Sequence, residues 1–441
     1  MTSLSQLRIA AKEIFDEALR GVDAEDAVRR SIQFSGSHFS ICDTAISARP
    51  IYAVALGKAA LSMSHALEQT LGQFFSGGVM VGLSPNLAQI EWLSKSRWNW
   101  YVGGHPLPSR ESLAAAADAV GLLQRADRER GLIVFLISGG GSAMMEWPAT
   151  LNISLKDLQD ANRVLVGCGA SISEINSVRR AFSALKGGKL AARAPNCDQI
   201  TLIVSDVPTG EEYNVASGPT IRARPDAAKA LEVVEGYNLR SRLPVPIMQA
   251  IETAREFSST SDCLRESFQI LGNENAVNSA ADAAQQHGFT VDIATEISDQ
   301  SIADGCEQLL RRLGQLRAKD EAVAPVCLIS GGEFACPVNG DGIGGRNLET
   351  ALRLAISHAG ANTEKHFVAL CAGTDGVDGN SEAAGAFLDD TTIERAQLLG
   401  LNPQDFLDRS DAFSFFDALG DVISTGPTGT NVRDLRILIS S

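Results

Sequence analysis

The chain has 441 residues, of which 44% are hydrophobic and 21% charged, and its formal net charge is −15 at pH 7. This length exceeds the size at which one hydrophobic core usually stops growing, so we expect two domains, each with its own core. The acidic balance argues against non-specific binding of nucleic acid, which needs a basic surface, and an anionic substrate would need local positive charge.

Cysteines and apolar runs narrow the class of protein further. The eight cysteines are scattered and include no Cys-x-x-Cys pair, which indicates a reducing compartment and no zinc site. Residues 1–20 form an amphipathic pattern with acidic residues instead of a signal peptide. The longest apolar run, residues 132–137, is far too short to span a bilayer. We therefore expect a cytoplasmic protein without membrane contact.

The first half of the chain alternates between helical and strand patterns. Apolar residues at helical spacing predict helices over residues 4–19 and 24–32. Apolar runs bounded by glycine-rich turns follow at residues 52–56, 79–81, 132–137 and 200–204, and each leads into a helical stretch. This alternation predicts a parallel sheet with helices on both faces.

A second series of strands follows a helical stretch over residues 226–234. These strands are expected at residues 268–271, 289–293, 326–329, 367–371 and 435–439. The proline-containing segment 241–246 separates the two series, so we place a soft domain boundary near Ser241. The expected domains are residues 1–240 and 241–441.

A glycine-rich turn follows the most apolar strand. Residues 132–137 run directly into Ser138-Gly-Gly-Gly-Ser142 and then into the start of a helix. Three glycines allow a tight turn whose N–H groups face an anion, and the helix N-terminus adds its positive dipole end. The segment is therefore either a phosphate or carboxylate nest or a turn needed only for packing.

Two cationic residues stand where they could meet an anion. Lys58 follows the strand 52–56, where lysines commonly face the cleft above the carboxyl edge of a sheet, although a solvated surface lysine is the alternative. Arg346 stands with Asn347 at a glycine-rich helix start and could clamp a carboxylate or phosphate. The nearby pattern Gly340-x-Gly342-x-x-Gly345 lacks a long buried strand just before it, so we discount a nicotinamide dinucleotide site.

Carboxylates follow several strand ends. They are Asp206, Glu333, Asp375 and Asp378. Mg²⁺ needs only one or two protein carboxylates beside the phosphates of a bound nucleotide, so these residues are candidate ligands. The alternative is an Asx-turn, in which an aspartate bonds its own backbone.

Three further segments are ambiguous by themselves. Lys186 and Gly187, in the turn after a helix that carries Asn176, either meet nucleotide phosphates or satisfy the helix dipole. His105 stands in a loop that could face a site, although a histidine held by its own turn is the simpler interpretation. Residues 426–431 form a turn with a polar cluster that includes Asn431. No P-loop, zincin or Gly-x-Ser-x-Gly motif is present.

Taken in order, ten motifs resemble the glycerate 2-kinase family, whose members combine the DUF4147 and MOFRL domains. They are Ala55-Leu-Gly-Lys-Ala-Ala60, Gly104-His-Pro-Leu-Pro108, Ser138-Gly-Gly-Gly-Ser142, residues 176–191, Ser205-Asp-Val-Pro208, Ser217-Gly-Pro-Thr220, Ser330-Gly-Gly-Glu333, Gly344-Gly-Arg-Asn347, Thr374-Asp-Gly376 with Ala383-Ala-Gly385, and residues 426–431. The series spans nearly the whole chain.

The resemblance implies a fold and a reaction. The implied fold is an α/β protein with a Rossmann-like parallel N-terminal domain, a smaller α/β C-terminal domain and an active site in the cleft between them. The implied reaction transfers the γ-phosphoryl group of ATP, with Mg²⁺, to the 2-hydroxyl of D-glycerate and gives 2-phosphoglycerate. The partners are then ATP and a small hydroxy acid, and the chain is a monomer or a homodimer.

The resemblance also implies roles for individual residues. Lys58, Arg346 and Asp206 are the expected catalytic residues. The expected contacts of the nucleotide phosphates are Ser138, Gly139, Gly140, Gly141, Ser142, Lys186 and Gly187. The expected contacts of the acid are Lys58, Arg346, Asn347, Glu333 and Asn431. Asp206 and Asp375 are the expected ligands of Mg²⁺, and either could instead orient the substrate hydroxyl.

The sequence departs from the family pattern at Thr209, Leu348 and Asn380. Such changes preserve fold and phosphoryl transfer but could shift the preferred acid. Two other classes stay open, because relatives with this pattern have been labelled hydroxypyruvate reductases, and a non-catalytic sugar-acid binding protein would also use an arginine and glycine-rich loops.

Overall fold

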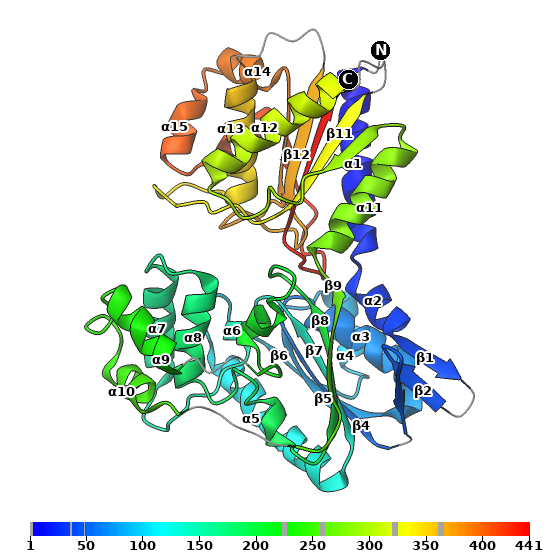
Figure 1. Cartoon of the computed structure of the whole chain (residues 1–441), viewed down its shortest axis with the longest axis vertical. Helices are drawn as coiled ribbons and strands as arrows, with labels where there is room; N and C mark the ends of the chain where they lie inside the picture. The colour runs from blue at the N-terminus through cyan, green and yellow to red at the C-terminus, as the bar shows by residue number, and fades with distance from the viewer. Residues whose placement is uncertain are drawn as a thin grey trace. The chain divides into compact units, whose positions relative to one another are not determined.

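The computed structural model describes residues 3–35, 38–47, 49–222, 227–255, 261–319, 325–359 and 366–441. The chain folds into two compact units. Unit 1 comprises residues 1–23 and 271–441, and unit 2 comprises residues 24–270. Figure 1 shows the elements of both units. The division differs from the expected one, because the boundary placed near Ser241 lies inside unit 2 and the N-terminal helix belongs to unit 1.

Unit 2 is organised around a six-stranded sheet of order β6-β5-β4-β7-β8-β9. Its strands are β4 (Ile51–Leu56), β5 (Phe75–Gly82), β6 (Trp98–Val102), β7 (Leu132–Ser138), β8 (Asp198–Val204) and β9 (Arg265–Leu271). The pairings among β6, β5, β4, β7 and β8 are all parallel. The chain starts at β4, moves outward to β6 and returns on the other side of β4 at β7, which is the order of a doubly wound Rossmann sheet. The predicted parallel sheet is confirmed.

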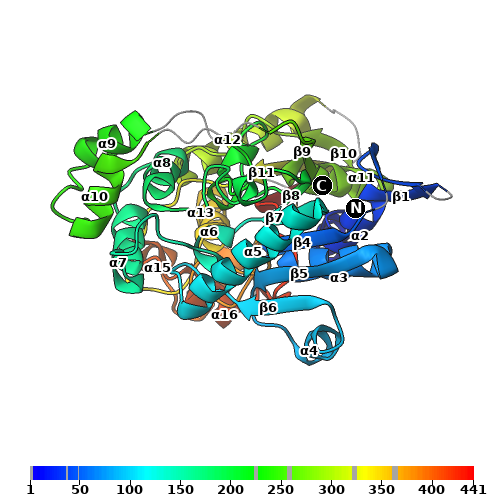
Figure 2. The same ribbon diagram turned by 90° about the horizontal axis from the view of Figure 1, so that it is seen from below.

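The helices of unit 2 are α2 (Ala24–Ser31), α3 (Ala60–Leu71), α4 (Leu87–Leu93), α5 (Arg110–Glu129), α6 (Gly141–Met144), α7 (Leu155–Val166), α8 (Ile172–Phe182), α9 (Ala227–Gly236) and α10 (Val245–Thr253). Of these, α3 and α5 pack on opposite faces of the sheet. Alanines of α5 pack against Tyr52, Val54 and Leu56 of β4. Because side chains alternate along a strand, Ala53 and Ala55 point to the other face, where α3 contacts the sheet. Figure 2 shows β4, β5 and β6 side by side.

Two features of unit 2 were not predicted from the sequence. Strands β1 (Ile32–Ser35), β2 (His38–Ile41) and β3 (Thr44–Ile46) form a separate antiparallel sheet. Helices α7 to α10 enclose a small core of their own. The helix expected over residues 226–234 is α9, and Asp226 lies outside the described residues.

Unit 1 contains a mixed six-stranded sheet of order β10-β11-β15-β12-β13-β14. Its strands are β10 (Thr290–Ile293), β11 (Val326–Gly332), β12 (Phe367–Gly373), β13 (Gly385–Asp389), β14 (Val422–Ile423) and β15 (Asp434–Ser440). The pair β10 and β11 is parallel, whereas β15 runs antiparallel to both β11 and β12. The last strand therefore completes the centre of the sheet.

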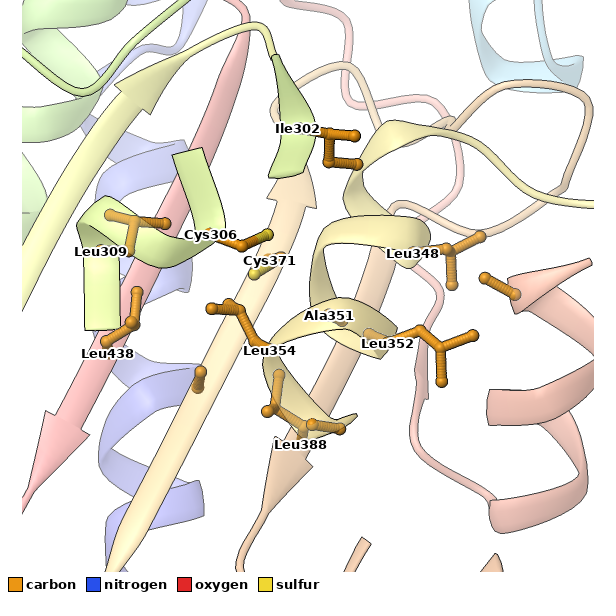
Figure 3. Close-up of a cluster of buried hydrophobic side chains, with 14 of the residues drawn as sticks. Ile302, Cys306, Leu309, Leu348, Ala351, Leu352, Leu354, Cys371, Leu388 and Leu438 are labelled. Atoms are coloured by element: carbon orange, nitrogen blue, oxygen red, sulfur yellow. The ribbon is translucent and has the colours of Figure 1, made fainter. Parts of the chain in front are cut away.

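Two layers of helices cover the sheet of unit 1. Its helices are α1 (Leu4–Gly21), α11 (Asn273–Gln286), α12 (Ile302–Lys319), α13 (Arg346–His358), α14 (Thr392–Leu398), α15 (Pro403–Asp408) and α16 (Ala412–Leu419). Cys327 and Ile329 pack with α1 and α11. Their strand neighbours Val326 and Leu328 pack with α12 and α13 on the opposite face. Figure 3 shows this second cluster, in which leucines of α13 meet Cys371 and Leu438 of the sheet.

Helix α1 belongs to unit 1 for physical reasons. The Ser3 hydroxyl and the Gln6 side chain form a capping box at its start. Ile14 and Phe15 are fully buried in the core that α1 shares with α11 and the sheet, and each such side chain stabilises the fold by about 1.5–3 kcal/mol. On the same helix, Arg8 forms ion pairs with Asp389 and Asp421, whose side chains are buried. The helical spacing was predictable, but these distant partners were not.

Two further features of the chain concern membrane-spanning helices and cysteines. Among the described residues, no helix is both long and apolar enough to cross a membrane. All eight cysteines lie in the described part of the chain, and each is a free thiol.

Candidate functional site

The carboxyl edge of the unit 2 sheet brings several of the expected residues together. The chain leaves β4 toward β5 on one side, and β7 lies on the other side, so the loops after β4 and β7 flank a topological switch point. Ligands of open α/β sheets bind at such points. The Lys58 amide donates a hydrogen bond to the Gly139 carbonyl at 2.8 Å, which ties the two loops together.

Glycine geometry makes this close approach possible. Gly57 has a φ of +117°, and a Cβ there would lie 2.3 Å from the Ser138 carbonyl oxygen. Gly140 has a φ of +80°, and a Cβ on it would lie 3.1 Å from Cγ of Lys58 and 3.6 Å from Cε1 of His105. Lys58 and His105 therefore lie beside the glycine turn.

The two serines of the turn have different surroundings. Ser138 is fully buried, and its hydroxyl accepts from the Ala59 amide at 3.0 Å and donates to the Leu56 carbonyl at 3.3 Å. This hydroxyl therefore joins the ends of β4 and β7. Ser142 Oγ is partly exposed and lies 2.5 Å from Ser217 Oγ, which donates to Asn176 Oδ1 at 2.7 Å.

The segment that carries Ser217 has an unusual backbone. It lies at the end of the 3₁₀ segment η3 (Glu212–Ser217), in which Ala216 has a φ of +50° and Ser217 a φ of +63°. Left-handed conformations of non-glycine residues are costly and persist only when their surroundings fix them. The Gly187 amide donates to the Ser217 carbonyl at 3.2 Å. The backbone N–H of Gly187 therefore holds this segment, which differs from the phosphate contact expected from the sequence.

The structure also changes the role that we assign to Lys186. Its side chain is 2% exposed, and its Nζ forms an ion pair with the equally buried Glu146. Glu146 Oε1 additionally accepts from the Ser183 hydroxyl at 2.6 Å. Burial lowers the pKa of the Lys186 ammonium, and the Glu146 carboxylate opposes that shift. A buried and paired ammonium stabilises the turn 183–190, and the expected phosphate contact of Lys186 is not part of this arrangement.

Asp206 lies at the same edge of the sheet. Val204, the last residue of β8, is the register partner of Ser138 in β7. Asp206 follows two residues later and is partly exposed. Asp206 therefore stands at the same sheet edge as the loop of Lys58 and the glycine turn, and carboxylate oxygens suit Mg²⁺.

In unit 1, Arg346 is the first residue of α13 and carries two carboxylate partners. Its Nε donates to Asp434 Oδ2 at 2.6 Å, and its Nη2 lies 2.6 Å from Glu333 Oε1. Burial lowers the pKa of the Arg346 guanidinium, but the carboxylates of Asp434 and Glu333 outweigh this effect and raise it. Arg346 is thus permanently charged and held in a defined orientation.

A buried polar network supports the start of α13. Asp378 accepts from the amides of Asn347 at 3.1 Å and Leu348 at 2.8 Å. The Asn347 side-chain amide donates to Asp378 at 3.2 Å and to Asp434 at 2.9 Å. Burial raises the pKa of Asp378 to about 7, against the effect of its backbone hydrogen bonds. Asn347 therefore links Asp378 to Asp434, which is one of the two carboxylates that position Arg346. The expected contact of Asn347 with the acid stays a prediction.

The remaining expected residues of unit 1 occupy turns. Asp375 Oδ1 accepts from the Val377 amide at 3.2 Å, which is the Asx-turn considered as the alternative to a metal ligand. Asn431 is 8% exposed, and its Oδ1 accepts from the Arg433 amide at 3.4 Å. No group of three or more His, Cys, Asp or Glu side chains suited to a metal ion occurs within the described ranges. A magnesium site here would use one or two carboxylates and water, which is its usual form in kinases.

The family departures lie in different environments. Leu348 is fully buried in the hydrophobic cluster around α13, and Figure 3 shows it on the side of α13 that faces away from Cys371 and Leu438. The Asn380 side chain accepts from the Gly344 amide at 2.8 Å and donates to the Gly342 carbonyl at 3.1 Å. Thr209 is exposed. Leu348 therefore serves packing, and Asn380 holds the loop that leads into Arg346.

The glycine pattern at residues 340–345 also has a structural explanation. Strand β11 ends at Gly332, so no strand runs directly into this loop. A Cβ on Gly340 would lie 2.4 Å from the Arg409 carbonyl oxygen, and a Cβ on Gly342 would lie 2.5 Å from Cβ of Asp411. These glycines allow close packing against residues 409–411.

Together, a doubly wound sheet with Lys58 at its switch point and a second unit with Arg346 at a helix start define an α/β protein that is equipped for small anionic ligands. Comparison with known proteins identifies the group. Residues 10–252 match the family model described as a domain of unknown function, DUF4147, and residues 326–434 match the MOFRL family.

Three similar proteins agree with these models. A D-glycerate 2-kinase from Thermotoga maritima is 34% identical over 389 residues, which cover 87% of this chain and 89% of that protein. The crystal structure of a glycerate kinase from Thermotoga maritima has a TM-score of 0.80 at 29% identity, over 99% of this chain and 100% of that one. A protein from Agrobacterium vitis named putative hydroxypyruvate reductase is 32% identical over 88% of this chain and 86% of that protein.

The chain belongs to the glycerate 2-kinase family. The relationship supports glycerate kinase activity and a small-molecule substrate. Sequence reasoning missed three residues that support the site, namely Glu146, Asp434 and Ser217. Each lies far along the chain from the residue that it holds, and no local pattern signals such a pair.

Proposed function

We propose that the chain is an ATP-dependent D-glycerate 2-kinase, which transfers the γ-phosphoryl group of ATP to the 2-hydroxyl of D-glycerate and releases 2-phosphoglycerate and ADP. The observation that carries the proposal is the position of Lys58 beside the glycine turn at the switch point of the unit 2 sheet. A lysine ammonium in this place meets an anionic ligand that the turn cradles.

Phosphoryl transfer depends on positioning the reactants and stabilising charge more than on covalent catalysis. The oxygen of the 2-hydroxyl forms a bond to the γ-phosphorus, the bond from that phosphorus to the bridging oxygen breaks, and ADP leaves with the electron pair. Lys58 would neutralise the oxygens of the transferred group. Asp206, a carboxylate at the same sheet edge, would orient the hydroxyl and take up its proton.

Arg346 would hold the carboxylate of the acid, since a guanidinium binds carboxylates through paired hydrogen bonds. Asp206 in unit 2 and Asp375 in unit 1 are the candidate ligands of Mg²⁺. When bound, Mg²⁺ supplies charge neutralisation at the phosphoryl oxygens. We further propose a cytoplasmic location, where ATP and small hydroxy acids are both present.

The test is an ADP-release assay with purified protein, ATP, Mg²⁺ and a panel of three- and four-carbon hydroxy acids, with the product identified by NMR. The expected result is turnover of D-glycerate with phosphorus attached at the 2-position. Turnover of another acid in place of D-glycerate would support kinase activity and would change the proposed substrate to that acid. No turnover with any acid would reject the proposal.

The name of the Agrobacterium relative favours a second candidate, reduction of hydroxypyruvate with a nicotinamide cofactor. Oxidation of NADPH by hydroxypyruvate with the same purified protein would support it. The kinase has the stronger support, because the glycine pattern at residues 340–345 follows no strand and the switch-point turn lies beside a lysine. A non-catalytic binding protein would bind the acid without any release of ADP.

A further inference from the structure

The two carboxylates that hold Arg346 differ in burial. The Asp434 side chain is 3% exposed, whereas the Glu333 side chain is 30% exposed and the Arg346 side chain is 35% exposed. The distances are equal, since each carboxylate oxygen lies 2.6 Å from its guanidinium nitrogen. Protein therefore encloses the Asp434 carboxylate, whereas solvent reaches the Glu333 carboxylate.

The surroundings of Asp434 fix it in place. Its Oδ2 accepts from Arg346, and its Oδ1 accepts from the side-chain amide of Asn347 at 2.9 Å. Asp434 is the first residue of the central strand β15, and its register partners are Gly332 in β11 and Gly373 in β12. Moving this carboxylate would disturb the end of the strand and remove an acceptor from both Arg346 and the buried Asn347 amide.

Glu333 lies on the first residue after β11. Its amide donates to Asp299 Oδ1 at 3.4 Å, a long and weak contact. The preceding Gly332 has a φ of +93°, which turns the chain out of the sheet at this point. The Glu333 side chain therefore projects from a turn and not from within the strand. A partly exposed ion pair of this kind contributes less to stability than its geometry suggests, because water competes for both charges.

We propose that Glu333 is an exchangeable counterion of Arg346, which the carboxylate of the small hydroxy acid displaces. This inference rests on the proposed function. It replaces the contact between Glu333 and the acid that the sequence suggested, because here the acid displaces Glu333 from Arg346. A substrate carboxylate arriving beside Arg346 would make a third negative group around one guanidinium, and repulsion expels the exposed one. An uncharged analogue gains nothing from the exchange, so Glu333 determines specificity for a charged acid.

The experiment compares wild type with Glu333→Gln, which keeps the size of the side chain and removes its charge. Calorimetric titration with D-glycerate is expected to give a Kd lowered about fivefold in the variant, the order expected when one exposed ionic competitor is removed. Binding of glycerol, which has the hydroxyls without the carboxylate, is expected not to change. Glu307→Gln, an exposed glutamate on α12 of the same unit, controls for net charge.

A double-mutant cycle identifies the route of the effect. In an Arg346→Ala background the Glu333→Gln change is expected to have no effect on D-glycerate binding, because the competition acts through the guanidinium. An unchanged or raised Kd in Glu333→Gln overturns the proposal, as does an equal gain in Glu307→Gln or a gain that persists without Arg346.

Failure of the proposed function can be distinguished from failure of the inference about Glu333. If the wild type neither binds nor phosphorylates D-glycerate, that function fails, and inorganic phosphate in the same titration decides the role of Glu333. Tighter phosphate binding by Glu333→Gln then supports an exchangeable counterion. Equal binding, or no binding of either anion by both proteins, overturns it.

Discussion

The two units hold their cationic residues in different ways. In unit 2, main-chain geometry places Lys58, through a left-handed Gly57, the glycine turn and a hydrogen bond to the Gly139 carbonyl. In unit 1, side-chain charges place Arg346, through Asp434, Glu333 and the buried network around Asp378. A site built from backbone responds to changes of shape, whereas a site built from carboxylates responds to changes of charge and pH.

The largest expected effect tests the cation of unit 2. Lys58→Ala is expected to lower kcat/KM for D-glycerate at least about a thousandfold, or about 4 kcal/mol of transition-state stabilisation, because the ammonium beside the glycine turn is lost. The ADP-release assay measures this effect, and circular dichroism checks the fold. Lys95→Ala, at an exposed lysine just after α4, is the matched control. If Lys58→Ala kept its activity within tenfold of wild type, Lys58 would have no catalytic role.

The next effect concerns the buried ion pair of Glu146 and Lys186 in unit 2. It tests whether unit 2 also depends on a charge, in addition to its backbone geometry. Glu146→Gln leaves the buried Lys186 without its counterion, which is expected to cost about 3–5 kcal/mol. The measurement is the urea denaturation midpoint. Replacing both partners, as Glu146→Leu with Lys186→Met, is expected to recover most of the loss. If the single and double variants were equally unstable, the ion pair would not be the cause.

In unit 1 the corresponding test is pH. The ordinary pKa of the Asp378 carboxyl is 3.8, and burial raises it to about 7 in the folded chain. The folded chain therefore keeps a proton that the unfolded chain loses above about pH 4. Stability contributed by this group is complete below that pH, falls as the pH rises to about 7 and is constant above it, with a total change of at most about 4 kcal/mol.

Denaturation midpoints measured from pH 4 to pH 8 in wild type and Asp378→Asn check this expectation. The asparagine cannot ionise, so its profile is expected to be flatter over that window, even though one hydrogen bond to the start of α13 is lost. Parallel profiles of the two proteins would contradict the titration of Asp378.

The smallest expected effect tests the backbone of unit 2. Gly57→Ala introduces a Cβ at a positive φ and 2.3 Å from the Ser138 carbonyl oxygen, and such local strain costs about 1–3 kcal/mol. Gly72→Ala is the matched control, because Gly72 also has a positive φ, +51°, but no atom within 4 Å of the added Cβ. Midpoints from chemical denaturation compare the two. Equal losses in both variants would show that crowding at Ser138 does not matter.

The sequence predicted well what depends on local pattern. Continuous apolar runs at β4, β7 and β8 indicated buried parallel strands, and the structure has them in that arrangement. The sequence placed both Lys58 and the glycine turn directly after strands of a parallel sheet, where loops share one edge, but only the structure shows that the two are adjacent. The family itself was recognisable from ten motifs, and the comparisons confirm it.

The sequence could not predict partners brought together by the fold. Glu146 lies 40 residues from Lys186, and Asp434 lies 88 residues from Arg346. Nothing in either segment distinguishes a carboxylate that meets a cation from one that meets water. The same limitation applies to helix α1, which packs in unit 1. Amphipathic spacing shows that a helix has an apolar face but not which core covers it.

The membership of α1 in unit 1 has a consequence for the order of synthesis. The ribosome makes α1 first, then the whole of unit 2, and only afterwards the strands on which α1 packs. Unit 2 can finish folding while translation continues, since domains fold as units during synthesis. The apolar face of α1, with Ile14 and Phe15, has to wait until β15 emerges. During that interval the apolar side chains of α1 lack the core that buries them in the folded protein.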